Sequence, residues 1–439
     1  MTTFDLLALL ISLTAFFGWV NHRFVRLPAT VGLMIISMAF SLALVALGKA
    51  GVGGTDLLAQ VLGQVDFGEA LLHGMLGALL FAGALHININ DLRENKWVIS
   101  LLATVGVIVS TVLVGTGAWI IFRWIGFEIP FVFALLFGAL ISPTDPIAVG
   151  AILRKAGVPR SLFIKITGES LFNDGVGVVL FLLILELSTG GSGHGAGEAV
   201  SAVVQAGSDA QHASDTTGIT LGQILNVLGV EVVGGLVFGG VMGWIVYRML
   251  KSVDAYQVEI LLTLAVVTGG YALAQLLHVS GPLAMVVAGL LIGNRGRSLA
   301  MSEETIRHLD SFWELADEFL NALLFVMIGI EVLILDYAPG YLLAGVLAIP
   351  LILASRMVSV ALPVTALRPF RAFSPHVVKI LTWSGLRGGI SVALALSLPQ
   401  GPFRDLLVTA TYVVVVFSIV FQGLTVGPAA RKLSEAARS

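Results

Sequence analysis

The sequence predicts an all-α protein that crosses a membrane many times. Of its 439 residues, 57% are hydrophobic and 12% are charged, and the mean hydropathy is +0.97. A typical soluble domain carries about 25% charged residues, so this chain cannot cover a water-soluble surface with polar groups. Long uncharged runs, among them 28–48, 97–122 and 406–430, provide the ~20 apolar residues that a membrane helix needs. We therefore expect a polytopic membrane protein and not a soluble enzyme.

The composition excludes several other classes of protein. The formal net charge of −3 and the pI of about 6.2 argue against a nucleic-acid-binding protein, which needs a basic surface. The chain has no cysteine, so disulfides, thiolate metal sites and cysteine nucleophiles are excluded. Its 50 glycines suit membrane helices, where small residues let backbones approach closely. Three of them, Gly235, Gly239 and Gly243, recur at four-residue spacing and predict a helix-packing face.

Thirteen membrane helices fit the hydropathy pattern. The uncharged run 260–294 is too long for one span, about 52 Å at the rise of an α-helix. It is interrupted by Pro282, which disfavours helix at the residue before it, so we divide it into two helices. The expected helices lie near 4–21, 28–48, 69–88, 97–122, 130–153, 162–187, 219–247, 257–277, 282–294, 313–335, 340–366, 376–399 and 405–428.

The positions of the basic residues predict how these helices are oriented. Most of the 24 lysines and arginines fall in the tail or in loops that follow odd-numbered helices. The opposite side would hold Lys49, Arg123 and Arg404. Because cytoplasmic loops carry an excess of positive charge, we expect the N-terminus outside and the C-terminus in the cytoplasm.

The odd number of helices predicts an inverted repeat. Six helices, a linker helix and six more place the two six-helix halves in opposite orientations, which is typical of secondary transporters. The segment after the sixth helix is rich in Gly, Ser, Ala and His and predicts a flexible external loop. The expected domains are residues 1–187 for the first repeat (core part 97–187), 188–218 for the loop, 219–256 for the linker helix, 257–428 for the second repeat (core part 340–428) and 429–439 for a short cytoplasmic tail.

The fifth helix of each half is interrupted by helix breakers and one ionisable residue. The two interruptions are Ser142-Pro143-Thr144-Asp145-Pro146 and Ser384-Gly385-Leu386-Arg387-Gly388-Gly389. The alternative interpretation is a proline kink in the first helix and a glycine packing site in the second, each of which is common alone. Their matched placement predicts crossed discontinuous helices, which survive within a membrane only where they are buried in protein or line a polar cavity.

The sixth helix carries the densest set of polar residues within a span. Ser170 and Asp174 lie four residues apart on one face, with Asn173 beside them and Glu169 above Asn173. A carboxylate, a hydroxyl and an amide suit a hard cation that prefers oxygen ligands, and the break at Thr144 could add carbonyl oxygens. The alternative is that Asp174 is a structural carboxylate satisfied by an arginine.

Buried charges within spans cost about 2.5–3.5 kcal/mol each on insertion scales, so each needs a partner or a function. Arg356, inside the eleventh span, is the cation most in need of a carboxylate, and Glu169 is the better candidate for that pair than Asp174. Arg387 is expected to neutralise the ends of the two broken helices, whose half-dipoles meet near mid-membrane.

These motifs together resemble one family. The run Gly168-Glu169-Ser170-Leu171-Phe172-Asn173-Asp174-Gly175, preceded by the 142–146 break, and the run from Trp383 to Ser391 are similar to motifs of the monovalent cation/proton antiporters, in the NhaP and animal sodium/proton exchanger branch. The resemblance covers nearly the whole chain, in order. It implies a thirteen-helix homodimer with a dimerisation domain and a mobile core domain that moves as an elevator.

The resemblance also implies roles for the polar residues. Asp174 would bind sodium and a proton alternately, with Thr144, Asp145 and Ser170 as nearby ligands or orienting groups and Asn173 as a supporting residue. Sodium would lie at Asp174, Ser170 and Thr144. The ion pair Glu169–Arg356 would hold the core. The Asn-Asp pair is the pattern of the electroneutral branch, and we expect one-for-one exchange with Asp145 capping a broken helix and not facing the cavity.

The sequence departs from the family pattern at two places, and both bear on the expected function and source of the protein. Related exchangers often have a glutamate in the third helix after Leu-Leu-Phe, where this chain has Ala82. The short tail lacks the long cytoplasmic domain of animal exchangers, which favours a prokaryotic protein of the inner membrane. We expect a transporter without enzymatic activity or cofactor whose partners are Na⁺, H⁺, the lipid bilayer and a second copy, with no nucleic acid. A potassium/proton antiporter on the same scaffold and, as a weaker alternative, an ion channel stay open.

Overall fold

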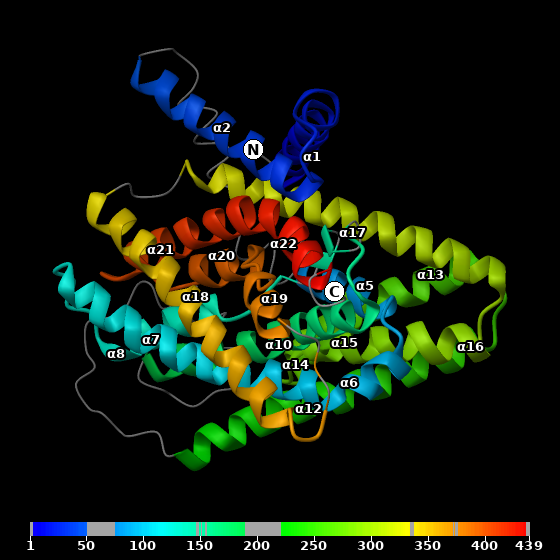
Figure 1. Cartoon of the computed structure of the whole chain (residues 1–439). Coiled ribbons are helices and arrows are strands. Elements are labelled where there is room, and N and C mark those ends of the chain that lie inside the picture. The colour runs from blue at the N-terminus through cyan, green and yellow to red at the C-terminus, as the bar shows by residue number, and fades with distance from the viewer. Residues whose placement is uncertain are drawn as a thin grey trace.

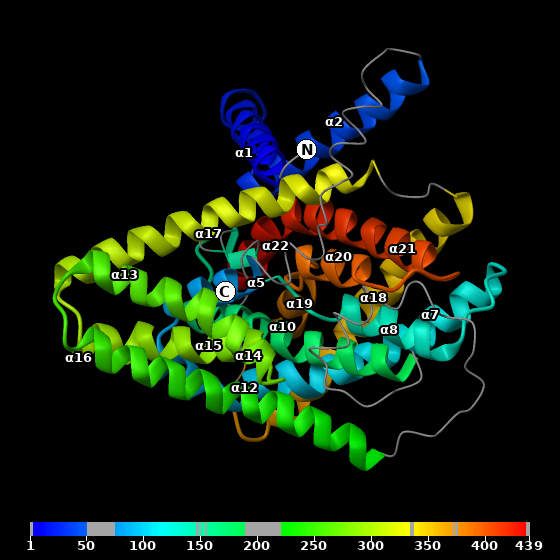
Figure 2. The same cartoon turned by 180° about the vertical axis from the view of Figure 1, so that it is seen from behind.

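The computed structural model describes residues 3–50, 75–145, 149–150, 152–153, 156–188, 221–333, 338–371, 373 and 376–435. Within these ranges the chain is helical and has no strand (Figures 1 and 2). Eight helical stretches there are long and apolar enough to cross a membrane, and α5 and α8 are shorter apolar helices. The prediction of an all-α polytopic membrane protein is confirmed.

The elements follow one another along the chain with short π-helical segments (η) inside several spans. Their bounds are α1 Thr3–Val20, η1 Asn21–Val25, α2 Ala29–Lys49, α5 Leu76–Leu85, α6 Ile89–Leu101, η3 Leu102–Gly106, α7 Val107–Trp124, α8 Phe131–Ile141, α10 Arg160–Ser188, α12 Leu221–Leu250, α13 Tyr256–Ala265, η5 Val266–Gly270, α14 Tyr271–Leu276, α15 Gly281–Leu291, η6 Ile292–Gly296, α16 Arg297–Leu299, α17 Glu303–Glu331, α18 Pro339–Leu367, α19 Val377–Trp383, α20 Gly389–Leu396, α21 Arg404–Phe417, η7 Ser418–Gln422 and α22 Gly423–Glu435.

Some helices are longer than the hydropathy pattern predicts. The helix expected at 97–122 is continuous from Ile89 to Trp124, and α17 begins at Glu303, well before the expected start at 313. The first half of α17 is amphipathic, with buried Leu309 and Trp313 among charged residues, which is why the hydropathy pattern placed the start of this helix too late. The loop expected at 188–218 lies outside the described residues from 189 on, as do residues 51–74 and the end of the tail.

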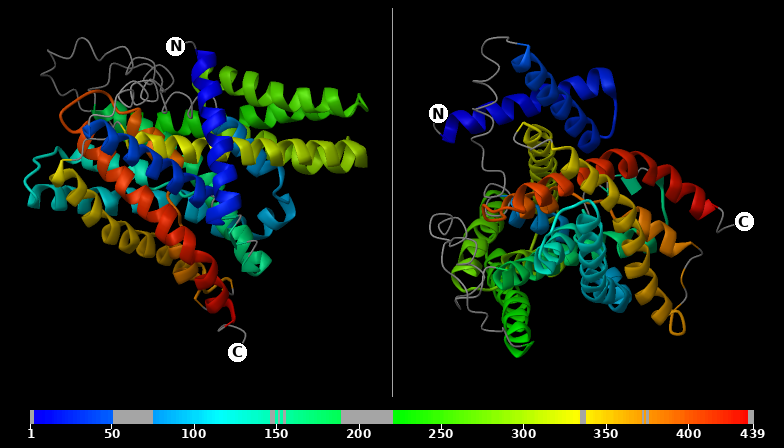
Figure 3. Two further views of the ribbon diagram at one scale, coloured as in Figure 1. Left: turned by 90° about the horizontal axis from the view of Figure 1, so that it is seen from above. Right: turned by 90° about the vertical axis from the view of Figure 1, so that its left-hand side faces the viewer.

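Two groups of helices form the body of the protein (Figures 1 and 2). In one group, α7 packs on α8 and α18, α8 on α10, and α18 on α21, which also contacts α20. In the other, α12 and α5 pack on α15, and α2 packs on α17. Helices α1 and α2 pack on α17 at the outer edge of the molecule (Figure 3). The first group comes mainly from the ranges 97–187 and 340–428, and the second from the rest of the chain.

Small residues set the contact between α12 and α15. A Cβ atom at Gly239 would lie 2.7 Å from Cα of Ala284, and one at Gly243 would lie 3.1 Å from Cα of Ala288. The first distance is too short for a real side chain against backbone, and the second is tighter than most contacts that a Cβ atom makes. The four-residue glycine spacing on α12 is therefore a helix-packing face, as the sequence predicts.

The two interrupted helices cross near the centre of the protein. Helix α8 ends at Ile141, and the chain is non-helical through Asp145. In the second half α19 ends at Trp383 and α20 begins at Gly389. The backbone N–H of Asp145 donates to the carbonyl oxygen of Leu386 at 2.8 Å. The two unwound segments thus satisfy part of each other's backbone, which is the condition for irregular chain at membrane depth.

Candidate ion-binding site

Helix α10 carries the polar residues to the centre of the protein. Glu169, Ser170, Asn173 and Asp174 are each at most 1% exposed. The unwound segment lies directly against this helix because Gly177 has no side chain, and a Cβ atom there would lie 3.1 Å from Cδ of Pro143. Glycine at this position therefore brings the residues after Pro143 within reach of the polar face of α10.

Thr144 is held by two residues of α10. Its backbone N–H donates to Oδ1 of Asn173 at 3.2 Å, and Nδ2 of Asn173 donates to Oγ1 of Thr144 at 2.7 Å. The hydroxyls of Thr144 and Ser170 are 2.9 Å apart. Nδ2 of Asn173 also donates to Oε1 of Glu169 at 3.0 Å. The amide of Asn173 thus joins the unwound segment to the buried carboxylate below it.

Glu169 and Arg356 form a buried ion pair between α10 and α18. Nη1 of Arg356 donates to Oε1 of Glu169 at 2.8 Å, and Nη2 donates to Oε2 at 2.7 Å. The two side chains are 1% and 5% exposed. Parallel bonds of this kind are the geometry in which an arginine and a carboxylate bind most strongly. Because Glu169 is paired with Arg356, its charge has a structural role. Asp174 is therefore the carboxylate on this face of α10 that is available to bind an ion.

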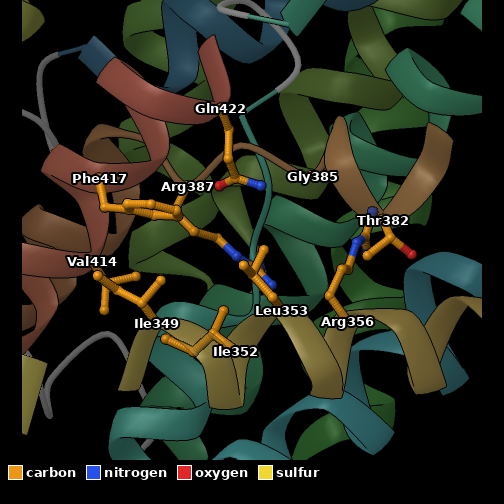
Figure 4. A pocket seen from close by; sticks show the side chains of 10 residues that line it. All are labelled: Ile349, Ile352, Leu353, Arg356, Thr382, Gly385, Arg387, Val414, Phe417 and Gln422. Atoms are coloured by element: carbon orange, nitrogen blue, oxygen red, sulfur yellow. The ribbon is translucent and has the colours of Figure 1, made fainter. Parts of the chain in front are cut away.

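Arg387 lies at the crossing and contacts the end of the opposite broken helix. Its Nη1 donates to the carbonyl oxygens of Ser142 and Pro143, the second at 3.0 Å. Its backbone N–H donates to Oγ of Ser418 at 2.8 Å. Figure 4 shows that its side chain and that of Arg356 reach a small pocket from different elements, Arg356 from α18. Arg387 is therefore placed to neutralise the carbonyl end of α8, where the half-dipole is negative.

Asp174 faces a cavity of about 750 Å³. Thr144 and Asp145 line the same cavity, whereas Ser170 and Asn173 are not among its lining residues and lie behind Thr144. Neither carboxylate oxygen of Asp174 has a hydrogen-bond partner among the described residues. An ionised carboxylate buried without a partner costs several kcal/mol or more. Asp174 therefore requires either a proton or a cation from the cavity.

Asp145 also faces this cavity, contrary to the expectation that it only caps a broken helix. Its backbone is fixed by the hydrogen bond to Leu386, and its carboxyl group lies beside Gly388, where a Cβ atom would come within 2.8 Å of Cγ of Asp145. Gly388 is the residue that precedes α20. The carboxyl group is thus next to the N-terminal end of α20, where the helix dipole is positive.

Several residues that line the cavity were not predicted as site residues from the sequence. Helix α17 contributes Asp310, Glu314, Asp317, Glu318 and Asn321, and α20 contributes Ser391. Asp310, Glu314, Asp317 and Asn321 recur at spacings of four, three and four, which places them on one helical face. That spacing was a usable signal, because Glu314, Asp317 and Asn321 fall within the helix expected at 313–335, but the sequence analysis did not connect this face with the ion site. Ala82 also lines the cavity, so no glutamate reaches it from that position.

Known proteins resemble this chain along nearly its whole length. The family model described as the transmembrane sodium/hydrogen exchanger matches residues 11–432. The Na(+)/H(+) antiporter NhaP of Pseudomonas aeruginosa is 48% identical over 434 residues, which cover 98% of this chain and 96% of that protein. The Na(+)/H(+) antiporter NhaH of Halobacillus dabanensis is 32% identical over 375 residues, 84% of each chain. The solved structure of the sodium proton antiporter MjNhaP1 from Methanocaldococcus jannaschii matches 97% of both chains with a TM-score of 0.71 at 18% identity, a likeness of fold alone.

Proposed function

Because this chain belongs to the sodium/hydrogen exchanger family, whose members are transporters and not enzymes, we propose that it exchanges sodium ions for protons at Asp174. The observation that carries the proposal is the buried carboxylate of Asp174, which faces the cavity without a hydrogen-bond partner among the described residues. A carboxylate in that position binds one cation or one proton, and each excludes the other. The relatives named above are sodium antiporters by name, which favours sodium over potassium; lithium, with the same preference for oxygen ligands, is a further substrate of the proposal.

Asp174 and Thr144 supply the oxygens that face the cavity, and Ser170 and Asn173 hold Thr144 in place. A proton that binds Asp174 removes the charge that attracts sodium, and sodium removes the basicity that attracts the proton. The two ions are the cargo, and the proposal includes no cofactor. Because sodium and the proton compete for one carboxylate, their fluxes are coupled, and no other group at the site has to move.

We propose further that the exchange is one for one and electroneutral. Glu169 is paired with Arg356, and the amide of Asn173 cannot carry a proton. Asp145 lies next to the positive end of α20, and the proposal assigns no transported proton to it. The site therefore has the same net charge when it holds sodium and when it holds a proton.

The packing of the helices supports an elevator movement, as the family resemblance implies. The cavity is lined on one side by α10 and the two unwound segments and on the other by α2, α5 and α17. These two sides belong to the two helix groups that pack mainly within themselves. Sliding of the group from 97–187 and 340–428 against the other would carry Asp174 across the membrane. A homodimer in the inner membrane, with the N-terminus outside and the C-terminus in the cytoplasm, completes the proposal.

The test is the substitution Asp174→Asn in the full chain, reconstituted in liposomes that contain a pH-sensitive dye. We expect sodium-driven proton flux in the parent and none in this variant, because an amide of the same shape exchanges no proton. The control is Asp405→Asn, the same chemical change at an acid whose side chain is 57% exposed at the start of α21. Normal flux through the Asp174 variant would disprove the assignment.

A further inference from the structure

Four polar side chains on α17 form a continuous row along the wall of the cavity. Asp310, Glu314, Asp317 and Asn321 all line it, and the row spans about 16 Å of helix axis. Glu314 is exposed, Asp317 is half-buried and Asn321 is 4% exposed. The row therefore leads from a solvent-exposed end at Glu314, here called the wet end, to a buried end at Asn321, within the same cavity that Asp174 lines.

The buried end of the row presents an oxygen without a donor. Nδ2 of Asn321 donates to the backbone oxygen of Asp317 at 2.7 Å and to Oδ1 of Asp317 at 3.1 Å. Both of these atoms are acceptors, so the amide has one permissible orientation. In that orientation Oδ1 of Asn321 has no hydrogen-bond partner among the described residues. A buried carbonyl oxygen of this kind requires a donor or a cation.

The same end of α17 lies beside the crossing of the unwound segments. Leu324, one turn after Asn321, packs against Gly389 at the start of α20. Gly388 and Gly389 line the cavity together with Leu324 and Asp145. Asn321 is therefore located between the wet end of the row and the part of the cavity that contains Asp174.

We propose that Asp317 and Asn321 form a second binding site for a monovalent cation, through which sodium passes on its way to Asp174. This inference rests on the proposed function. The ligands are the carboxylate of Asp317, Oδ1 of Asn321 and water, for which the cavity has room. No lysine or arginine is found among the described residues that line the cavity, so the ligand is a cation. Oxygen ligands of this type match the preference of a hard cation.

The neighbouring acids explain why the site is at Asp317. Asp310 forms an ion pair with Arg297, in which Nη1 of Arg297 also donates to Oδ2 of Asp310 at 3.1 Å, so its charge is already compensated. Glu314 and Glu318, a further acid of α17 that lines the cavity, are both exposed to water, where a monovalent cation stays fully hydrated. Asp317 is the acid of the row whose carboxylate is combined with a buried neutral oxygen, which replaces part of the hydration shell.

This second site would also lie on a different helix group from Asp174. Helix α17 packs on α2, α1 and α5, whereas Asp174 belongs to the group formed by α7, α8, α10, α18 and α21. Sodium would therefore be transferred from the group that carries α17 to the group that carries Asp174. An ion held at Asp317 raises the local concentration next to Asp174 and with it the rate of loading.

The binding test uses the Asp174→Asn variant, which removes the carboxylate of the first site. We expect its melting temperature to be higher in sodium than in choline at equal ionic strength, because a bound ion stabilises the folded state. The double variants Asp174→Asn/Asp317→Asn and Asp174→Asn/Asn321→Ala are expected to lose this difference. If the Asp174→Asn variant shows no difference between sodium and choline, the second site does not exist, whatever the transport assay shows for the parent.

The transport test uses the single variant Asp317→Asn, which preserves the shape of the side chain. We expect the sodium concentration for half-maximal flux to rise by about tenfold, with the maximal rate at saturating sodium nearly unchanged. Glu303→Gln, which removes an exposed acid of the same helix outside the cavity, is the matched control and is expected to behave as the parent. An unchanged half-maximal concentration in Asp317→Asn would overturn the inference, whereas absence of exchange in the parent would overturn the proposed function.

Discussion

Asn173 and Thr144 are joined by two hydrogen bonds of opposite direction. The backbone N–H of Thr144 donates to Oδ1 of Asn173, and Nδ2 of Asn173 donates to Oγ1 of Thr144. The remaining hydrogen of the same NH₂ group points to Glu169. This position therefore needs one acceptor and two donors, and a neutral amide supplies them. The pair fixes the unwound segment next to Asp174 without adding a charge.

The first prediction follows from that requirement. Asn173→Asp would lose both donors and place a second carboxylate about 3 Å from Glu169. We expect the free energy of unfolding to fall by about 3 kcal/mol or more, seen as a lower melting temperature of the purified protein. Asn90→Asp, the same change at an exposed residue, is the control. A variant at position 173 that melts with the parent would show that the amide is not required there.

The second prediction concerns the pair Glu169–Arg356. Removal of either partner leaves a buried charge without its counter-ion, because both side chains are at most 5% exposed. We expect Glu169→Ala and Arg356→Ala each to lower the stability by about 3–5 kcal/mol. The double variant should be more stable than the sum of the two losses predicts, because neither unpaired charge remains. Additive losses in a double-mutant cycle of melting experiments would contradict the pairing.

The third prediction is that transport does not respond to membrane potential. One sodium ion and one proton compete for Asp174, so the loaded site has the same charge in both directions. In liposomes with potassium and valinomycin, an imposed potential should leave the initial sodium/proton exchange rate unchanged. A clear dependence would mean that a second group titrates during the cycle. Asp145 is the first candidate because it also lines the cavity, and Asp145→Asn would then abolish the dependence.

The fourth prediction concerns the contact between α12 and α15. Gly239→Ala would place a methyl group 2.7 Å from Cα of Ala284, and backbone cannot move aside as a flexible side chain can. We expect a loss of about 1–3 kcal/mol of stability. Gly240, the next residue, has no atom within 4 Å of the position that a Cβ would take. Gly240→Ala is therefore expected to melt at the parent temperature or slightly above it, and equal behaviour of the two variants would refute the packing argument.

The sequence alone determined the class of the protein and the location of its irregular segments. Hydropathy decides that a span enters a membrane, because the cost of burying charge and backbone in lipid is large and local. The breaks at 142–146 and 384–389 were predictable for the same reason, since proline and glycine act on their own residues and immediate neighbours. Helical spacing likewise placed Glu169 over Asn173 and Ser170 near Asp174, which are within one turn of each other.

Tertiary structure decided which of these groups face the cavity. Ser170 and Asn173 share a helix with Asp174 but lie behind Thr144, while Asp145 lines the cavity that we expected it to avoid. These outcomes depend on how one helix is rotated against another, and helical periodicity relates residues only within a helix. The row on α17 is the clearest case. Its spacing was visible in the sequence, but only packing places that face on the cavity opposite α10, where a carboxylate can meet a cation in place of bulk water.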